Sequence, residues 1–180
     1  CFDKNIVFLQ ILENEWYDNT KNKIWKSIID HKLNRTKNII YARKCKIIDN
    51  FSYVSFFQTN HLQGNRNASI QIGLEYGGNI VSCMTFNRHS KYEWEIIRYA
   101  TLLGNVVVGG ASKLFKYFIS SLNPTSILTF ADLRYSNGSI YEKLGFKLLG
   151  RTNAGYMYLN HNNILSRHKC QKHKLPSLLS

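Results

Sequence analysis

A glycine pair lies where a predicted strand meets a predicted helix, and there it could hold a phosphate group. Gly109 and Gly110 follow a run of valines and precede a helical pattern over residues 112–122. Backbone N–H groups at the start of a helix carry partial positive charge, and glycines let an anion approach them closely. Lys113 adds a cation at this point. The pattern predicts a pyrophosphate site, and its alternative is a simple tight turn.

Three further side chains, in two separate segments, are candidate catalytic residues. The apolar strand predicted over residues 127–131 leads into Asp132 and Arg134. Because such strand ends face the ligand crevice of an open α/β sheet, both residues are candidate catalytic residues, or else form a structural ion pair. His61, in the polar segment 60–64, is the third candidate. It either orients a substrate amine or reads a base edge, or it satisfies loop backbone groups.

Two motifs resemble the GNAT superfamily of N-acetyltransferases. The family's cofactor loop reads Gln/Arg-x-x-Gly-x-Gly/Ala, which this chain matches from Val106 to Ala111 except at its first position. The family's next helix commonly ends Tyr-x-Lys-x-Gly-Phe, as Tyr141 to Phe146 does here. The resemblance covers about residues 60–160.

The resemblance implies a fold, a cofactor and catalytic roles. The fold is a mixed α/β domain with a splayed central sheet flanked by helices, and acetyl-CoA or a related acyl-CoA lies in the splay. The implied cofactor-binding residues are Val107, Val108, Gly109, Gly110, Ala111, Ser112 and Lys113. Tyr141 matches the tyrosine that protonates the departing thiolate, and a phenol with a pKa of about 10 suits that role. The candidate general bases are Glu75, Glu93, Glu95 and Asp132, each of which is otherwise a surface or structural carboxylate.

A wider resemblance covers nearly the whole chain. It rests on four blocks in a fixed order, at residues 10–16, 40–45, 60–64 and 108–115. These blocks are similar to those of homing-endonuclease-like proteins of phages, large DNA viruses and other mobile elements. In such proteins a segment similar to the very-short-patch-repair endonucleases precedes a GNAT-like domain. The resemblance implies a nuclease-like remnant over residues 1–50, a GNAT-like domain over 51–165 and a truncated basic tail over 166–180.

The remnant is not expected to cleave DNA or to bind a metal. Metal-dependent nucleases need at least two convergent carboxylates, and only Glu13 or Glu15 is available here. The chain has four cysteines but no CxxC pair, so no zinc site is indicated. A metal site built from His61, Cys83 and the histidines and cysteine of the tail is conceivable, but nothing in the spacing requires it.

Hydrophobic patterning predicts the elements that must position these residues. The N-terminal appendage is predicted as a strand over 6–12, a helix over 20–33 and a strand over 39–48. The remaining predictions are helices over 51–58, 112–122 and 139–144 and strands over 69–76, 80–86, 94–99, 127–131 and 156–159. Gly77 and Gly78 predict a hairpin between the strands 69–76 and 80–86.

The chain is strongly basic, with 24 Lys and Arg against 11 Asp and Glu and a formal net charge of +13. This excess favours an anionic partner, DNA before a membrane surface, although it would also serve as a solubilising surface. The candidate nucleic-acid contacts are Lys21, Lys23, Lys26, Arg43, Lys44, Lys46, Arg167 and Lys169. No apolar run approaches the length of a membrane helix, and no membrane partner is expected.

Three hypotheses of function follow. In the first, a GNAT-fold acyltransferase-like domain of a DNA-associated viral or mobile-element protein transfers an acyl group to an amine, conceivably on a nucleobase. The segment around Asp132 also resembles phage DNA-modification proteins that alter adenine. In the second, the chain is a non-catalytic DNA-recognition module of a homing-endonuclease-like protein. Gly109, Gly110 and Tyr141 favour the first hypothesis. Val106, together with the absence of an obvious general base, favours the second.

A remnant nuclease is the third hypothesis. The expected compartment is the cytoplasm of a bacterial or virus-infected host cell.

Overall fold

The computed structural model describes residues 6, 8–49, 51–153, 158–160, 163–165, 168, 170–174 and 176. The chain divides into two compact units, residues 1–147 and 148–180. In its described residues the second unit contains an antiparallel hairpin of β8 (Tyr158–Asn160) and β9 (Asn163–Leu165). The strand predicted over 156–159 overlaps β8, and residues 156 and 157 lie outside the described residues. The candidate catalytic and cofactor-binding residues all belong to the first unit.

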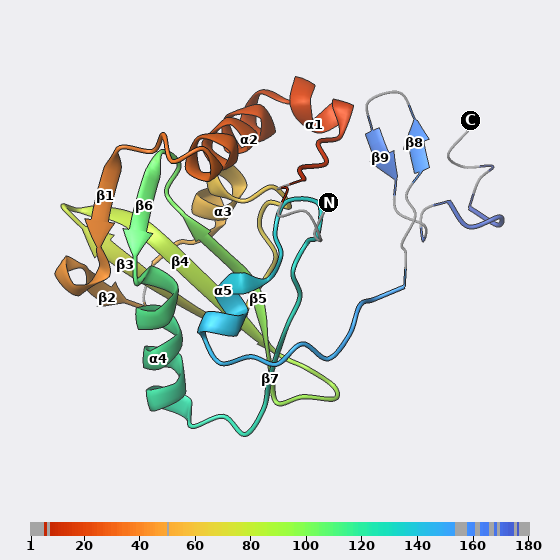
Figure 1. Cartoon of the computed structure of the whole chain (residues 1–180). Helices are drawn as coiled ribbons and strands as arrows, with labels where there is room; N and C mark the ends of the chain where they lie inside the picture. The colour runs from red at the N-terminus through yellow and green to blue at the C-terminus, as the bar shows by residue number, and fades with distance from the viewer. Residues whose placement is uncertain are drawn as a thin grey trace. The chain divides into compact units, whose positions relative to one another are not determined.

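A five-stranded, mostly antiparallel sheet forms the centre of the first unit, in the order β2-β3-β4-β5-β7 (Figure 1). Its strands are β2 (Lys46–Ile48), β3 (Ile70–Tyr76), β4 (Asn79–Arg88), β5 (Trp94–Thr101) and β7 (Ile127–Thr129). Only the β5–β7 pair of this sheet is parallel. The predicted hairpin is confirmed, since Gly77 and Gly78 both adopt positive φ between β3 and β4.

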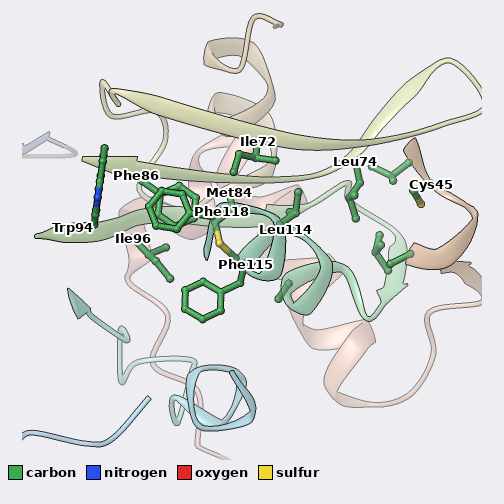
Figure 2. Close-up of a cluster of buried hydrophobic side chains, with 14 residues drawn as sticks. Cys45, Ile72, Leu74, Met84, Phe86, Trp94, Ile96, Leu114, Phe115 and Phe118 are labelled. Carbon is green, nitrogen blue, oxygen red and sulfur yellow. The ribbon is translucent and has the colours of Figure 1, made fainter. Parts of the chain in front are cut away.

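Helices cover both faces of this sheet, so the predicted α/β class is confirmed. The helices are α1 (Glu13–Tyr17), α2 (Asn19–Lys32), the 3-10 helix η2 (Ala42–Lys44), α3 (Val54–Asn60), α4 (Gly110–Leu122) and α5 (Ser139–Lys143). On one face Phe118 of α4 belongs to the same buried cluster as Met84 (Figure 2). On the other face Phe57 of α3 packs with Cys83. Neighbouring residues of β4 point to opposite faces, which gives the sheet its two cores.

A second, two-stranded parallel sheet joins β1 (Asn38–Tyr41) to β6 (Asn105–Val108), which lie side by side in Figure 1. β6 leads directly into the glycine pair and α4. Through β1 and β2 the N-terminal region is therefore part of both sheets. The boundary predicted at residue 50 does not separate two compact units, because residues 1–147 form one.

The N-terminal region corrects two predictions. Residues 8–12 have no regular secondary structure, so the strand predicted over 6–12 is wrong, and α1 begins where that strand was expected to end. Ile11 instead packs against the buried cluster of Ile24 and Trp25 on α2. The strand predicted over 39–48 is two strands, β1 and β2, which η2 separates and which belong to different sheets.

The helix predicted over 20–33 is confirmed as α2. Asp18 caps its first turn, with Oδ1 accepting the backbone N–H groups of Thr20 and Lys21 at 3.0 and 2.8 Å. The inward face carries Ile24, Trp25 and, one helical turn after Ile24, Ile28, which packs the helix against the rest of the unit.

Candidate functional site

Arg134 is the centre of a largely buried ion-pair network. Its Nη1 donates to Oε2 of Glu15 at 2.9 Å, and its Nη2 donates to Oδ2 of Asp132 at 2.9 Å. The side chains of Arg134, Glu15 and Asp132 are 21%, 6% and 17% exposed. Trp25 Nε1 also donates to Glu15 Oε2, at 3.2 Å. The predicted site residues Asp132 and Arg134 are thus paired with each other, and Glu15 is a partner that the sequence did not indicate.

The loop after β7 is shaped by this pairing. Asp132 Oδ1 accepts the backbone N–H of Arg134 at 3.1 Å, a local turn typical of aspartate. The backbone carbonyl of Arg134 accepts the N–H of Gln10 at 2.9 Å, which ties residues 8–12 to the loop. Burial alone would raise the pKa of Asp132, but its hydrogen bonds from Arg134 outweigh that effect and hold the pKa below its usual value.

His61 lies beside this network. Its Nδ1 accepts the backbone N–H of Gln63 at 3.2 Å, and the Gln63 side chain reaches Asp132 Oδ2 at 3.5 Å. Burial, followed by the charge of Arg98, lowers the pKa of His61 to about 4, although Asp132 opposes the shift. His61 is therefore neutral at pH 7, and the structure does bring it together with Asp132 and Arg134.

Tyr141, the fourth predicted catalytic residue, lies on α5. Its ring packs edge-on against Phe146, with ring centroids 5.9 Å apart. It is close enough to Tyr135 and Arg98 to affect their pKa values. Burial, with the charge of Asp132, raises the pKa of Tyr135 to about 12. The four predicted residues thus share one region, linked through Asp132 and Tyr135.

The other predicted general bases make structural contacts. Glu75 accepts a hydrogen bond within the β3–β4 hairpin. Glu93 accepts both the backbone N–H and the hydroxyl of Thr125, at 2.7 and 2.9 Å. Glu95 lies 3.8 Å from Arg66. None of these three contacts joins the carboxylate to the network around Arg134.

The low pKa of His61 predicts a pH dependence of stability. Between pH about 6.5 and 4, unfolded His61 binds a proton that folded His61 does not, so the free energy of unfolding should fall as pH is lowered through this window. The expected loss is about 1–3 kcal/mol.

Urea unfolding of the chain and of His61→Gln across this window measures the loss. The slope should be much smaller in the variant, and an equal slope in both proteins would contradict the assignment. Asp132 contributes only at lower pH, because its pKa lies below its usual value.

An open groove of about 570 Å³ lies beside the glycine pair, between η2 and α4. Of the predicted cofactor-binding residues, four line this groove, namely Val108, Gly109, Ser112 and Lys113. The other three, Val107, Gly110 and Ala111, are buried. The structure thus divides the predicted loop between the groove and the core.

Several residues of the predicted cofactor loop, 107–113, already make contacts within the protein. Residues 106–108 belong to β6 and pair with β1. Lys113 Nζ donates to the backbone carbonyls of Ala42 at 2.9 Å and Cys45 at 2.6 Å, so it stabilises η2. A Cβ on Gly110 would lie 2.9 Å from Val107, which explains this glycine by close packing. Gly109 is explained by its φ of +77°.

The predicted nucleic-acid contacts lie in two places. Lys23 and Lys26 are exposed on α2, with Lys21 partly buried. Arg43, Lys44 and Lys46 are exposed on η2 and β2. Arg167 and Lys169 lie outside the described residues. Arg43 is the predicted contact that lines the groove.

Lys116 also lines the groove, although it is not among the nucleic-acid contacts predicted from the sequence. Its position three residues after Lys113 places both on one face of α4, and this spacing was the available signal.

No protein-family model matches this chain, and no curated protein or solved structure matches it. No helix among the described residues is long and apolar enough to cross a membrane. Within the same described part of the chain, His, Cys, Asp and Glu side chains form no group of three suited to a metal ion. Cys45 and Cys83 are buried free thiols.

Proposed function

We propose that this chain is a nucleic-acid-binding module that binds DNA through the groove between η2 and α4 and does not transfer an acyl group. The lining of the groove carries the proposal: Arg43, Lys113 and Lys116 all line it, and no carboxylate is among its described lining residues. Cations that neutralise phosphates release counterions from DNA, which drives binding. The net charge of +13 adds a general attraction.

The region around Arg134 supports a non-catalytic role. General acid–base catalysis is most efficient when a group has a pKa near the working pH. Here the pKa of His61 is about 4 and that of Tyr135 is about 12. Asp132 has a lowered pKa and is ion-paired. These groups are poor candidates for removing a proton from an amine at pH 7.

A second candidate, acyl transfer in a GNAT-like domain, is favoured by two specific observations. The groove is lined by Val108, Gly109, Ser112 and Lys113, to which the resemblance assigns the pyrophosphate of acyl-CoA. The short parallel pairing of β5 with β7, which ends at Ile96 and Thr129, also supports a splayed sheet. Under either candidate, the resemblance supports a DNA-associated viral or mobile-element protein acting in the host cytoplasm.

Two titrations separate the candidates. A labelled DNA oligonucleotide, as a single strand and as a duplex, is titrated by fluorescence anisotropy at about 50 and 200 mM salt. Acetyl-CoA is titrated separately by calorimetry. The proposal expects DNA binding that weakens steeply with salt and no binding of acetyl-CoA. Binding of acetyl-CoA without salt-dependent DNA binding would instead select acyl transfer.

The double variant Arg43→Gln/Lys116→Gln should bind DNA more weakly. If each side chain contacts one phosphate, the slope of log K against log salt should become shallower by about 2. The matched control is Lys91→Gln/Lys143→Gln, which removes the same charge from two exposed lysines outside the groove. An equal loss in both double variants would mean that overall charge, rather than the groove, binds DNA.

A further inference from the structure

The groove contains aromatic side chains as well as cations. Tyr41 closes β1, and its side chain is 43% exposed. The guanidinium carbon of Arg43 lies 5.1 Å from the centre of the Tyr41 ring. On the opposite wall Tyr117 is partly buried, and its hydroxyl donates to Asp49 at 3.4 Å. A rigid aromatic ring beside unpaired cations is the combination used to bind nucleotides with exposed bases.

Arg43 is held in place through its neighbours. Lys113 Nζ donates to the carbonyl of Ala42, the first residue of η2, and to that of Cys45, the residue that follows η2. Apart from the Tyr41 ring, the Arg43 guanidinium has no partner among the described residues, and neither has the Lys116 ammonium. Both are free to bind phosphates, whereas Lys113 acts mainly as a positioning residue.

The concave shape of the groove favours a single strand over a duplex. Its volume of about 570 Å³ is that of a site for a small molecule, typically 300–1,000 Å³. Duplex recognition instead uses an element that projects into a groove of the DNA, such as a helix in the major groove. Gly109 lines the groove and leaves open space there, because a Cβ added at Gly109 would have only the Ala42 side chain nearby, at 3.8 Å.

We infer that the groove binds single-stranded nucleic acid, with one base stacked on Tyr41 and neighbouring phosphates on Arg43 and Lys116. The inference rests on the proposed function and makes it more specific. Val108, the register partner of Tyr41, is 46% exposed and offers an apolar contact beside the ring. Stacking on any base is favourable, so little sequence preference is expected.

The test is a competition between strands. Anisotropy with a labelled single strand of about 12 nucleotides is measured with single-stranded and duplex competitors of the same length and salt. The single strand should compete at least tenfold better. Tyr41→Ala should weaken binding of the single strand by about 5- to 100-fold, the range of one base stack, and Tyr41→Phe should retain it.

Tyr76→Ala is the matched control, because Tyr76 is 42% exposed and lies at the β3–β4 hairpin, outside the groove. If duplex competes equally well and Tyr41→Ala binds normally, the inference is overturned while the proposed function stands. If neither form binds, both are overturned. Should Tyr41→Ala fold poorly by circular dichroism, the competition ratio of the unaltered chain decides alone.

Discussion

Replacing Arg134 with methionine is expected to lower the free energy of unfolding by about 3–5 kcal/mol. The substitution keeps an unbranched side chain but removes the cation that pairs with Glu15 and Asp132. Glu15 is 6% exposed and would keep only the hydrogen bond from Trp25. An uncompensated charge in that position is costly, because only a small part of the carboxylate is exposed to water. Urea unfolding followed by circular dichroism measures the loss.

Two further variants test the cause of that loss. Glu15→Gln added to Arg134→Met removes the more deeply buried of the two carboxylate charges left unpaired, so the double variant should recover part of the stability. Arg66→Met makes the same substitution in a pair that is 3.8 Å apart and whose arginine is 56% exposed. It should cost less than about 1 kcal/mol. If Arg66→Met and Arg134→Met were equally destabilising, the network around Arg134 would not be a special source of stability.

Phe118→Ala should also lower the free energy of unfolding by about 3–5 kcal/mol. Phe118 is fully buried, and Figure 2 shows its ring lying over that of Phe86. The two rings are parallel with centroids 3.6 Å apart, and Trp94 meets Phe118 edge-on at 5.4 Å. Truncation removes both contacts and leaves a cavity between α4 and the sheet.

The neighbouring Ile119→Ala is the control, because Ile119 is 39% exposed on the same helix. It should change stability by less than about 1 kcal/mol. If Phe118→Ala does not fold, Phe118→Leu fills part of the cavity and should give an intermediate loss. Equal effects of Phe118→Leu and Ile119→Ala would show that the α4 face of the sheet does not depend on Phe118.

The elements with a clear local pattern could be predicted from the sequence. The helix α2, the helix α4 and the hairpin between β3 and β4 follow from helical spacing, alternation and two glycines. The strand predicted over 6–12 is wrong, because a short apolar run is typical both of a strand and of an irregular segment packed against a helix. Periodicity alone does not separate these two arrangements.

Long-range pairing could not be predicted. Nothing local to Asn38–Tyr41 indicates that this strand pairs with Asn105–Val108, because parallel pairing depends on the whole connecting fold. The same holds for Glu15, which meets Arg134 across 119 positions of sequence. The Asp132–Arg134 ion pair could be predicted from the sequence, because the two residues are only two positions apart.

The pairing of β1 with β6 and of β2 with β3 has a consequence for what counts as one domain. A chain shortened to begin at residue 51 would lack the neighbours of β3 and β6, and their free edges could recruit strands from other molecules. The first 50 residues are therefore counted with the strands that follow them, as part of one compact unit of residues 1–147. The groove itself is shared, since Tyr41 and Arg43 form one wall and α4 the other. It belongs to neither part of the chain alone and exists only after both have folded together.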